Sequence, residues 1–91
     1  MRLSGKVALI TGAGPMGAAI ARRFAEEGAS LILTDVSGAR LDATAGELRG
    51  KTRVVAHRAD VTVRQEALAV AEAGLAEFGR VDILCHLVGG I

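Results

Sequence analysis

Apolar residues recur along this chain with two alternating periods. Short apolar runs, typical of strands, alternate with segments in which apolar residues recur every three or four positions, as on one face of a helix. The runs predict four strands, at residues 6–11, 30–35, 53–57 and 81–88. The segments between them predict three helices, at residues 16–27, 37–50 and 62–79. This order predicts a Rossmann-type α/β fold of three layers (α/β/α), with a parallel sheet of four strands in the order 3-2-1-4.

Several residues mark where these helices begin and end. Ser37 is placed to cap the second helix, while Gly28 and Gly79 are typical stops for the first and third. Thr62 and Gln65 have the spacing of a capping box at the start of the third helix. We expect that helix to bury one apolar stripe, formed by Leu68, Ala71, Leu75 and Phe78.

The last predicted strand, residues 81–88, is apolar at nearly every position. Such a strand is typical of the middle of a parallel sheet, with helices on both faces and a neighbour on each edge. The chain ends at Ile91, soon after this strand. We therefore expect residues 1–91 to form a truncated half-domain that binds NAD(P), whose fourth strand pairs with a missing C-terminal half or with another copy.

A glycine-rich loop, Thr11-Gly12-Ala13-Gly14-Pro15-Met16-Gly17, joins the first strand to the first helix. A strand, a G-x-G-x-x-G loop and a helix in this order are typical of dinucleotide binding, because the helix start offers free amides and a positive dipole end to a diphosphate. We expect Gly12 to permit the tight turn, Gly14 to let the backbone approach the phosphates, and Gly17 to let the helix pack on the strand. Met16 belongs to the same predicted contact region. Alternatively, the glycines only shape a tight turn.

Two acidic residues follow strands at positions where a nucleotide would lie. Asp35 ends the second strand, where a carboxylate can accept hydrogen bonds from the adenosine ribose and repel a 2′-phosphate, so NAD is favoured over NADP. Its alternative role is to cap a helix or a turn. Asp60 follows the third strand and can either bind the adenine edge or belong to the next turn. Arg40 can in principle attract a 2′-phosphate, but we expect it to be solvated on the second helix.

Composition excludes several other classes of function. Aromatic residues make up 2% of the chain and the net charge is +1, so neither a stacking surface for nucleic acid nor a charged membrane surface is indicated. No signal peptide or membrane-spanning segment is evident, and we expect a cytoplasmic protein. The single Cys85 lies in an apolar strand and is expected to be a buried, inert thiol. Neither His57 nor His86 has metal-ligand spacing, although His86 lies near the ligand-binding end of its strand.

Taken together, these residues resemble the N-terminal half of a short-chain dehydrogenase/reductase. The resemblance rests on the opening strand at residues 3–12, the acid Asp35, the Asp60-Val61 pair and the lead into the fourth strand at residues 78–84. In this family the Asp-Val pair contacts adenine, so the resemblance implies that Asp60 and Val61 lie at the adenine site. It also implies an NAD cofactor and hydride transfer between an alcohol and a carbonyl in the full-length parent.

The chain also departs from the family pattern. Its glycine loop is one residue shorter than usual and instead resembles that of 3-hydroxyacyl-CoA dehydrogenases, which also bind NAD. The Asn-Asn-Ala-Gly stretch of the family is replaced by residues 86–89, of which only Val88 and Gly89 are carried over as cofactor contacts. The family's catalytic Ser and Tyr-x-x-x-Lys come after this region, and the chain has no Tyr. We therefore expect no catalytic residue and no dehydrogenase activity in these 91 residues alone; the alternative is a non-catalytic nucleotide-binding or self-associating scaffold module.

Overall fold

Residues 2–87 are described by a computed structural model, in which four parallel strands form one sheet in the order β3-β2-β1-β4. The predicted strand order is therefore confirmed. The strands are β1 (Val7–Thr11), β2 (Ser30–Thr34), β3 (Val54–Ala56) and β4 (Ile83–His86). The helices are α1 (Pro15–Glu26), α2 (Gly38–Leu48) and α3 (Arg64–Phe78).

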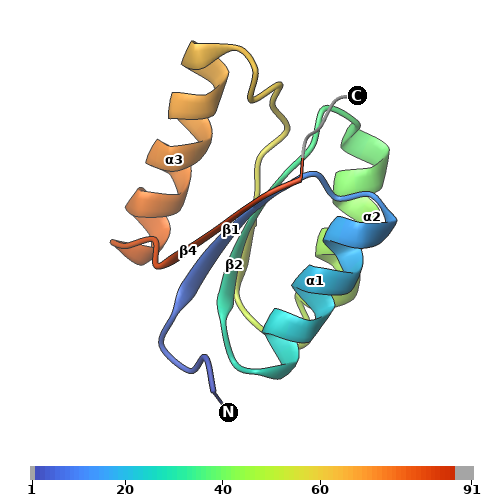
Figure 1. Ribbon diagram of the computed structural model, residues 1–91, viewed down its shortest axis with the longest axis vertical. Helices are drawn as coiled ribbons and strands as arrows, with labels where there is room; N and C mark the ends of the chain where they lie inside the picture. The colour runs from blue at the N-terminus through green and yellow to red at the C-terminus, as the bar shows by residue number, and fades with distance from the viewer. Residues whose placement is uncertain (1, 88–91) are drawn as a thin grey trace.

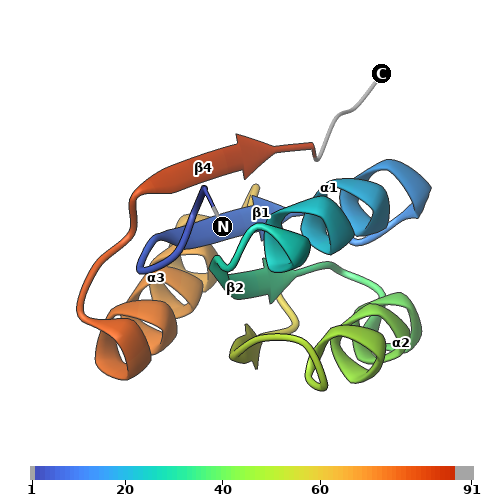
Figure 2. The same ribbon diagram turned by 90° about the horizontal axis from the view of Figure 1, so that it is seen from below.

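The sheet separates two helical layers. Figure 1 shows α1 and α2 on one side of the strands and α3 on the other, and Figure 2 shows the same three layers from below. The α1/α2 side holds the larger apolar cluster, which includes Ile10, Leu31, Leu33 and Leu48. The α3 side holds a smaller cluster, formed by Val7, Ile32, Ala59 and Val70. Strand residues therefore alternate between the two clusters, as a sheet covered on both faces requires.

The helix ends follow three of the four predicted signals, and Gly28, which stops α1, has φ +92°. The Ser37 side chain caps α2 by accepting a hydrogen bond from the Arg40 amide at 3.2 Å. Gly79 ends α3 in the left-handed conformation, with φ +76°. The predicted capping box of α3 is wrong, because Val63 is the N-cap and the Thr62 hydroxyl instead donates to the Asp60 carboxylate.

The predicted apolar stripe of α3 is wrong in part: Phe78 packs against the smaller cluster, but the two leucines of the stripe are exposed. Leu68 and Leu75 are 52% and 48% exposed, whereas Val70 and Gly74 are buried against the sheet. A Cβ at position 74 would lie 2.3 Å from Ile32 Cδ1, so the helix approaches β2 more closely than a side chain there would permit. The tightest contact thus selects a residue without a side chain, which a hydrophobicity pattern cannot recognise.

Strand β4 is half-covered rather than buried on both faces. Ile83 and Cys85 pack against the α1/α2 cluster, while Leu84 is 63% exposed and His86 is exposed. The reason is that α3 packs over β2 and β3, so within residues 2–87 no helix covers the α3 side of β4. Cys85 is partly buried, and it is a free thiol.

Both ends of β4 are fixed to β1. At its amino end, the Asp82 carboxylate accepts a hydrogen bond from the Val7 amide at 2.8 Å, and the Asp82 amide donates to the Val7 carbonyl. At its carboxyl end, the Leu87 amide donates to both the carbonyl and the hydroxyl of Thr11. These contacts hold the carboxyl ends of β1 and β4 side by side next to the glycine loop.

Candidate functional site

A cavity of about 270 Å³ lies at the carboxyl ends of the strands, where ligands bind in open α/β sheets. A smaller cavity of about 170 Å³ adjoins it and is lined by the first turn of α1. The two cavities share three lining residues, Gly12, Gly14 and Leu87. The larger cavity is also lined by Thr34, Asp35, Val36, Arg40, Ala59 and Val61.

The glycine loop makes a turn that other residues would obstruct. Gly12 has φ +95°, a conformation that favours glycine, and its amide donates to the Thr34 carbonyl at 2.9 Å. A Cβ on Gly17 would lie 1.7 Å from the Gly12 carbonyl oxygen, so α1 can approach the loop only with a glycine at this position. A Cβ on Gly14, by contrast, would meet nothing within 4 Å among the described residues. Gly14 is thus not required by packing, as expected for a residue whose free side faces a ligand.

The start of α1 presents uncapped amides to the smaller cavity. Gly14 is the N-cap and provides no side-chain hydrogen bond, and Pro15 follows at the first helical position. The first amides of a helix have no intrahelical acceptor, which applies here to Met16 and Gly17. Both residues line the smaller cavity, as does Pro15. Free amides and the positive end of the helix dipole make this a suitable place for a phosphate group.

The Asp35 carboxylate connects the glycine loop to the start of α2. Its Oδ2 accepts a hydrogen bond from the Ala13 amide at 2.7 Å, and its Oδ1 accepts from the Ser37 amide at 2.8 Å and the Arg40 guanidinium at 3.0 Å. The Asp35 side chain is only 4% exposed. Asp35 therefore has the alternative role that was expected for it, in the turn before a helix. It has this role at the edge of the larger cavity.

The charge of Asp35 is stabilised by these contacts. Burial raises the pKa of the Asp35 carboxyl, but hydrogen bonds from Arg40 and from the Ser37 and Ala13 amides outweigh burial, so the pKa lies below its ordinary value. Asp35 is therefore a carboxylate at neutral pH. A negatively charged acceptor thus lies beside the cavity.

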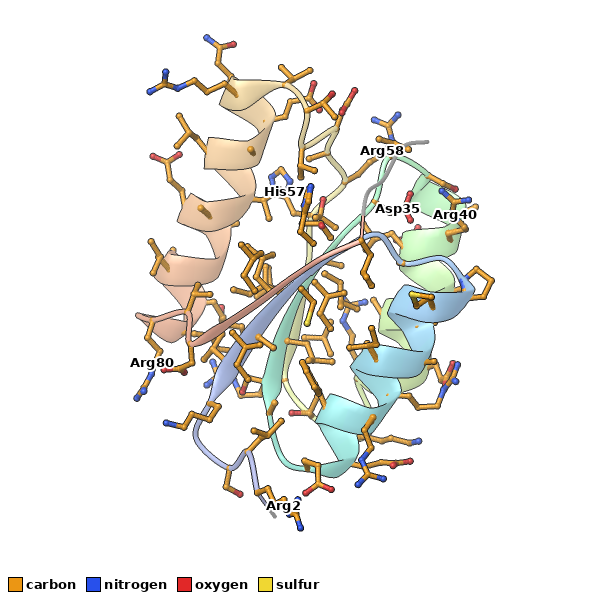
Figure 3. The ribbon with its side chains drawn as sticks, in the orientation of Figure 1. Arg2, Asp35, Arg40, His57, Arg58 and Arg80 are labelled. Atoms are coloured by element: carbon orange, nitrogen blue, oxygen red, sulfur yellow. The ribbon has the colours of Figure 1, made fainter. Side chains whose placement is uncertain are left out.

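Arg40 is exposed to solvent, as expected, and its guanidinium also pairs with Asp35. Figure 3 shows the two side chains together beside the start of α2. The Arg40 side chain is 56% exposed and the Asp35 carboxylate raises its pKa. Arg58 lies near the same end of the sheet, where its Nε donates to the Val36 carbonyl at 2.9 Å. The turn into α2 brings Arg40 to Asp35, whereas the pairing of β2 with β3 brings Arg58 to Val36.

Of the predicted adenine pair, the structure places only Val61 in the cavity lining. The Asp60 carboxylate accepts hydrogen bonds from the amide and hydroxyl of Thr62, and these bonds lower its pKa. The turn role of Asp60 is therefore observed, and a contact with adenine stays a prediction. The predicted contacts Val88 and Gly89 lie outside the described residues.

Sequence reasoning missed several residues in and around the cavities. Ala13 supplies the amide that Asp35 binds, and Thr34 lines the larger cavity at the end of β2. Leu87 lies over the glycine loop: its Cβ is 3.4 Å from the position of a Cβ on Gly12, and its Cδ1 is 3.6 Å from that on Gly17. The sequence did hold one signal for Thr34 and Leu87. The predicted strand order places the carboxyl ends of β1, β2 and β4 next to one another.

Metal-ligand clusters and membrane-spanning helices are both absent from residues 2–87. Among residues 2–87, no three His, Cys, Asp or Glu side chains gather as metal ligands. In the same range, no helix has the length and apolarity needed to cross a bilayer.

Comparison with known proteins identifies similar chains. The family model described as short chain dehydrogenase matches residues 6–91. The 7alpha-hydroxysteroid dehydrogenase of Escherichia coli (strain K12) is 38% identical over 92 residues, covering 99% of this chain and 36% of that protein. These matches agree with the resemblance inferred from the residues.

Comparison with solved structures likewise identifies dehydrogenases and reductases. A short chain dehydrogenase/reductase from Burkholderia phymatum in complex with NAD has a TM-score of 0.87 at 40% identity, covering 92% of this chain and 31% of its own. The 3-ketoacyl-(acyl-carrier-protein) reductase from Brucella melitensis complexed with NADH has a TM-score of 0.83 at 43% identity, covering 90% of this chain and 34% of its own. The chain spans about a third of the length of the proteins it matches.

Gly14 and Gly17 have different surroundings, so replacing each by alanine should affect the stability of the fold differently. Gly17→Ala should destabilise the fold by about 2 kcal/mol or more, because its methyl group collides with the Gly12 backbone, which cannot move without opening the turn. Gly14→Ala should change stability by less than about 0.5 kcal/mol, since open space surrounds its Cβ. Urea unfolding of the two variants measures both effects. Equal stabilities would contradict the described loop geometry.

The Asp35 network predicts an acid-dependent contribution to stability. Because folding lowers the pKa of Asp35, its contribution is present above the unfolded pKa, about 3.9, and is lost as pH falls through the folded pKa. Asp35→Asn should therefore destabilise the protein by about 1–3 kcal/mol at pH 7, and this difference should shrink as the pH approaches 2. Urea unfolding of both proteins across this range measures the difference. Asp42→Asn, at an exposed position of α2, is the matched control and should show little change.

Proposed function

The chain belongs to the short-chain dehydrogenase family, and from this premise we propose that it forms the NAD-binding portion of an NAD-dependent oxidoreductase. The observation that carries the proposal is the charged Asp35 carboxylate at the edge of a cavity that continues to the uncapped start of α1. The relatives whose structures contain NAD or NADH, at 40% and 43% identity, support the choice of cofactor.

The two adjoining cavities suit the two ends of an adenosine diphosphate group. The diphosphate would lie at the smaller cavity, on the amides of Met16 and Gly17, with Gly14 leaving room for its approach. The adenosine would lie in the larger cavity, against Val61 and next to Asp35. Gly12 would hold the turn between them, and Asp60 would approach the adenine edge from the β3–α3 loop.

Asp35 retains the capacity to bind a ribose hydroxyl. A carboxylate has about four acceptor positions, two on each oxygen, and among residues 2–87 only the Ala13 amide donates to Oδ2. The remaining position on Oδ2 can accept a hydrogen bond from the sugar. The same charge would repel a 2′-phosphate, and Arg40, the nearest cation, is already paired with Asp35. NAD is therefore favoured over NADP.

The reaction proposed for the whole protein is hydride transfer between an alcohol and a carbonyl, carried by the nicotinamide. In this reaction the described residues would bind and orient the cofactor. The contribution of Leu87, which replaces a family amide above the glycine loop, would be to exclude water from the apolar side of that loop.

A second candidate function is a module that self-associates through β4. Its support is the unpaired edge of β4 within residues 2–87 together with the 63% exposure of Leu84, since an open apolar edge can pair with another strand. Sedimentation of the chain with and without NAD distinguishes the two functions. A stable dimer that binds no NAD would favour the module.

Cofactor preference tests the proposed role of Asp35. Isothermal titration should show that the chain binds NAD, and that Asp35→Ala lowers the affinity for NAD about tenfold or more, because a hydrogen bond to a charged group is lost. The same substitution releases Arg40 and removes the repulsion, so the affinity for NADP should stay constant or rise.

Titrating both cofactors into the same variant separates recognition from disruption. If Asp35→Ala only disordered the glycine loop, the affinities for NAD and NADP would fall by the same factor. Asp42→Ala, which removes an exposed carboxylate from α2, is the control and should alter neither affinity. An unchanged ratio of the two affinities in Asp35→Ala would contradict the proposed role of Asp35.

A further inference from the structure

Asp35 lines the larger cavity, yet its side chain is almost completely covered. Only 4% of that side chain is exposed. Three groups donate hydrogen bonds to its carboxylate, namely the Ala13 amide, the Ser37 amide and the Arg40 guanidinium. Because so little of the carboxylate is open, a sugar in the cavity can reach its oxygens only if a covering group moves.

Of the three donors, Arg40 is the one on the cavity side. Arg40 belongs to the lining of the larger cavity, whereas Ala13 and Ser37 do not. Figure 3 shows the Arg40 side chain reaching back from α2 to the Asp35 carboxylate. The part of the carboxylate that faces the cavity is therefore the part that Arg40 covers.

Arg40 is also the donor that can move without disturbing the fold. Ala13 and Ser37 donate through backbone amides, which are fixed by the glycine loop and by the start of α2. Arg40 donates through the end of a long side chain, which is 56% exposed and forms no other side-chain hydrogen bond within residues 2–87. An ion pair with so exposed a partner contributes little to stability, so opening it costs little.

We propose that Arg40 is a specificity-determining residue, which covers Asp35 in the free protein and is displaced from Oδ1 by the ribose of NAD. This inference rests on the proposed function. The sugar hydroxyl takes the acceptor position that the guanidinium leaves, so the carboxylate keeps its hydrogen bonds. Since binding has to open the pair, the affinity for NAD is reduced in proportion to the fraction of molecules in which the carboxylate is open.

The same residue has the opposite effect on NADP. A 2′-phosphate is repelled by the Asp35 carboxylate and attracted by a guanidinium, and the ion pair keeps the Arg40 guanidinium within 3.0 Å of that carboxylate. Arg40 therefore weakens the binding of NAD and supports the binding of NADP. It narrows the preference for NAD that Asp35 alone would produce.

Arg40→Met tests the proposal, because methionine keeps an unbranched side chain without the charge. Isothermal titration at pH 8, well above the ordinary pKa of a carboxyl group, should show NAD bound about two- to fivefold more tightly than by wild type, as expected for the removal of an exposed ion pair. NADP should be bound more weakly, because the carboxylate remains and the cation is gone. More than half of the Arg40 side chain is exposed, so the variant should fold.

Two further variants separate this competition from a general loss of positive charge. Arg22→Met is the matched control: Arg22 pairs with Glu47 of α2, both side chains are 43% exposed, and neither residue lines either cavity. This variant should leave both affinities unchanged. In the Asp35→Ala background, Arg40→Met should no longer strengthen NAD binding, because no carboxylate is left to uncover.

The outcomes distinguish this inference from the proposed function. An NAD affinity of Arg40→Met equal to or weaker than that of wild type would overturn the inference while leaving the proposed function intact. So would changes in the same direction for NAD and NADP, or an equal gain in NAD affinity in Arg22→Met or in the Asp35→Ala background. No NAD binding by the wild-type chain would overturn the proposed function and this inference together.

Discussion

The arrangement of the site depends on one buried carboxylate. Asp35 binds the backbone of the glycine loop through Ala13, the start of α2 through Ser37, and a cation through Arg40. These partners come from two separate segments, the glycine loop and the start of α2, so the conformation of each depends on the same side chain. Because hydrogen bonds to the charged form outweigh the cost of burial, the residue remains ionised while it holds the loop. Structural support and the proposed electrostatic selection of a cofactor are therefore assigned to the same group.

Much of the fold follows from local sequence signals. Strand-like and helix-like periods alternate cleanly, and right-handed crossovers then leave few topologies, so the order β3-β2-β1-β4 was predictable. The glycine turn and the place of Asp35 beside it were also predictable, because a turn of this kind and an acid after the second strand have fixed chemical requirements. Their contacts with a cofactor stay predictions.

The errors concern packing between distant segments. Hydrophobicity favoured Leu68 and Leu75 as the buried side of α3, but the close approach to Ile32 selected Gly74. The pairing of Arg40 with Asp35 was missed for a different reason. The two residues are only five positions apart, but their spacing does not show where the start of α2 points the guanidinium.

The two attachments of β4 determine how precisely this edge is presented. Asp82 anchors one end to Val7 and Leu87 anchors the other to Thr11, with only four strand residues between them. A slip by one residue would turn Ile83 and Cys85 outward and Leu84 inward, and it would break both anchors at once. The backbone N–H and C=O groups on the outer edge of β4 are therefore held in a single register. Any chain that extended the sheet at this edge would meet a template whose alignment had been set in advance by β1.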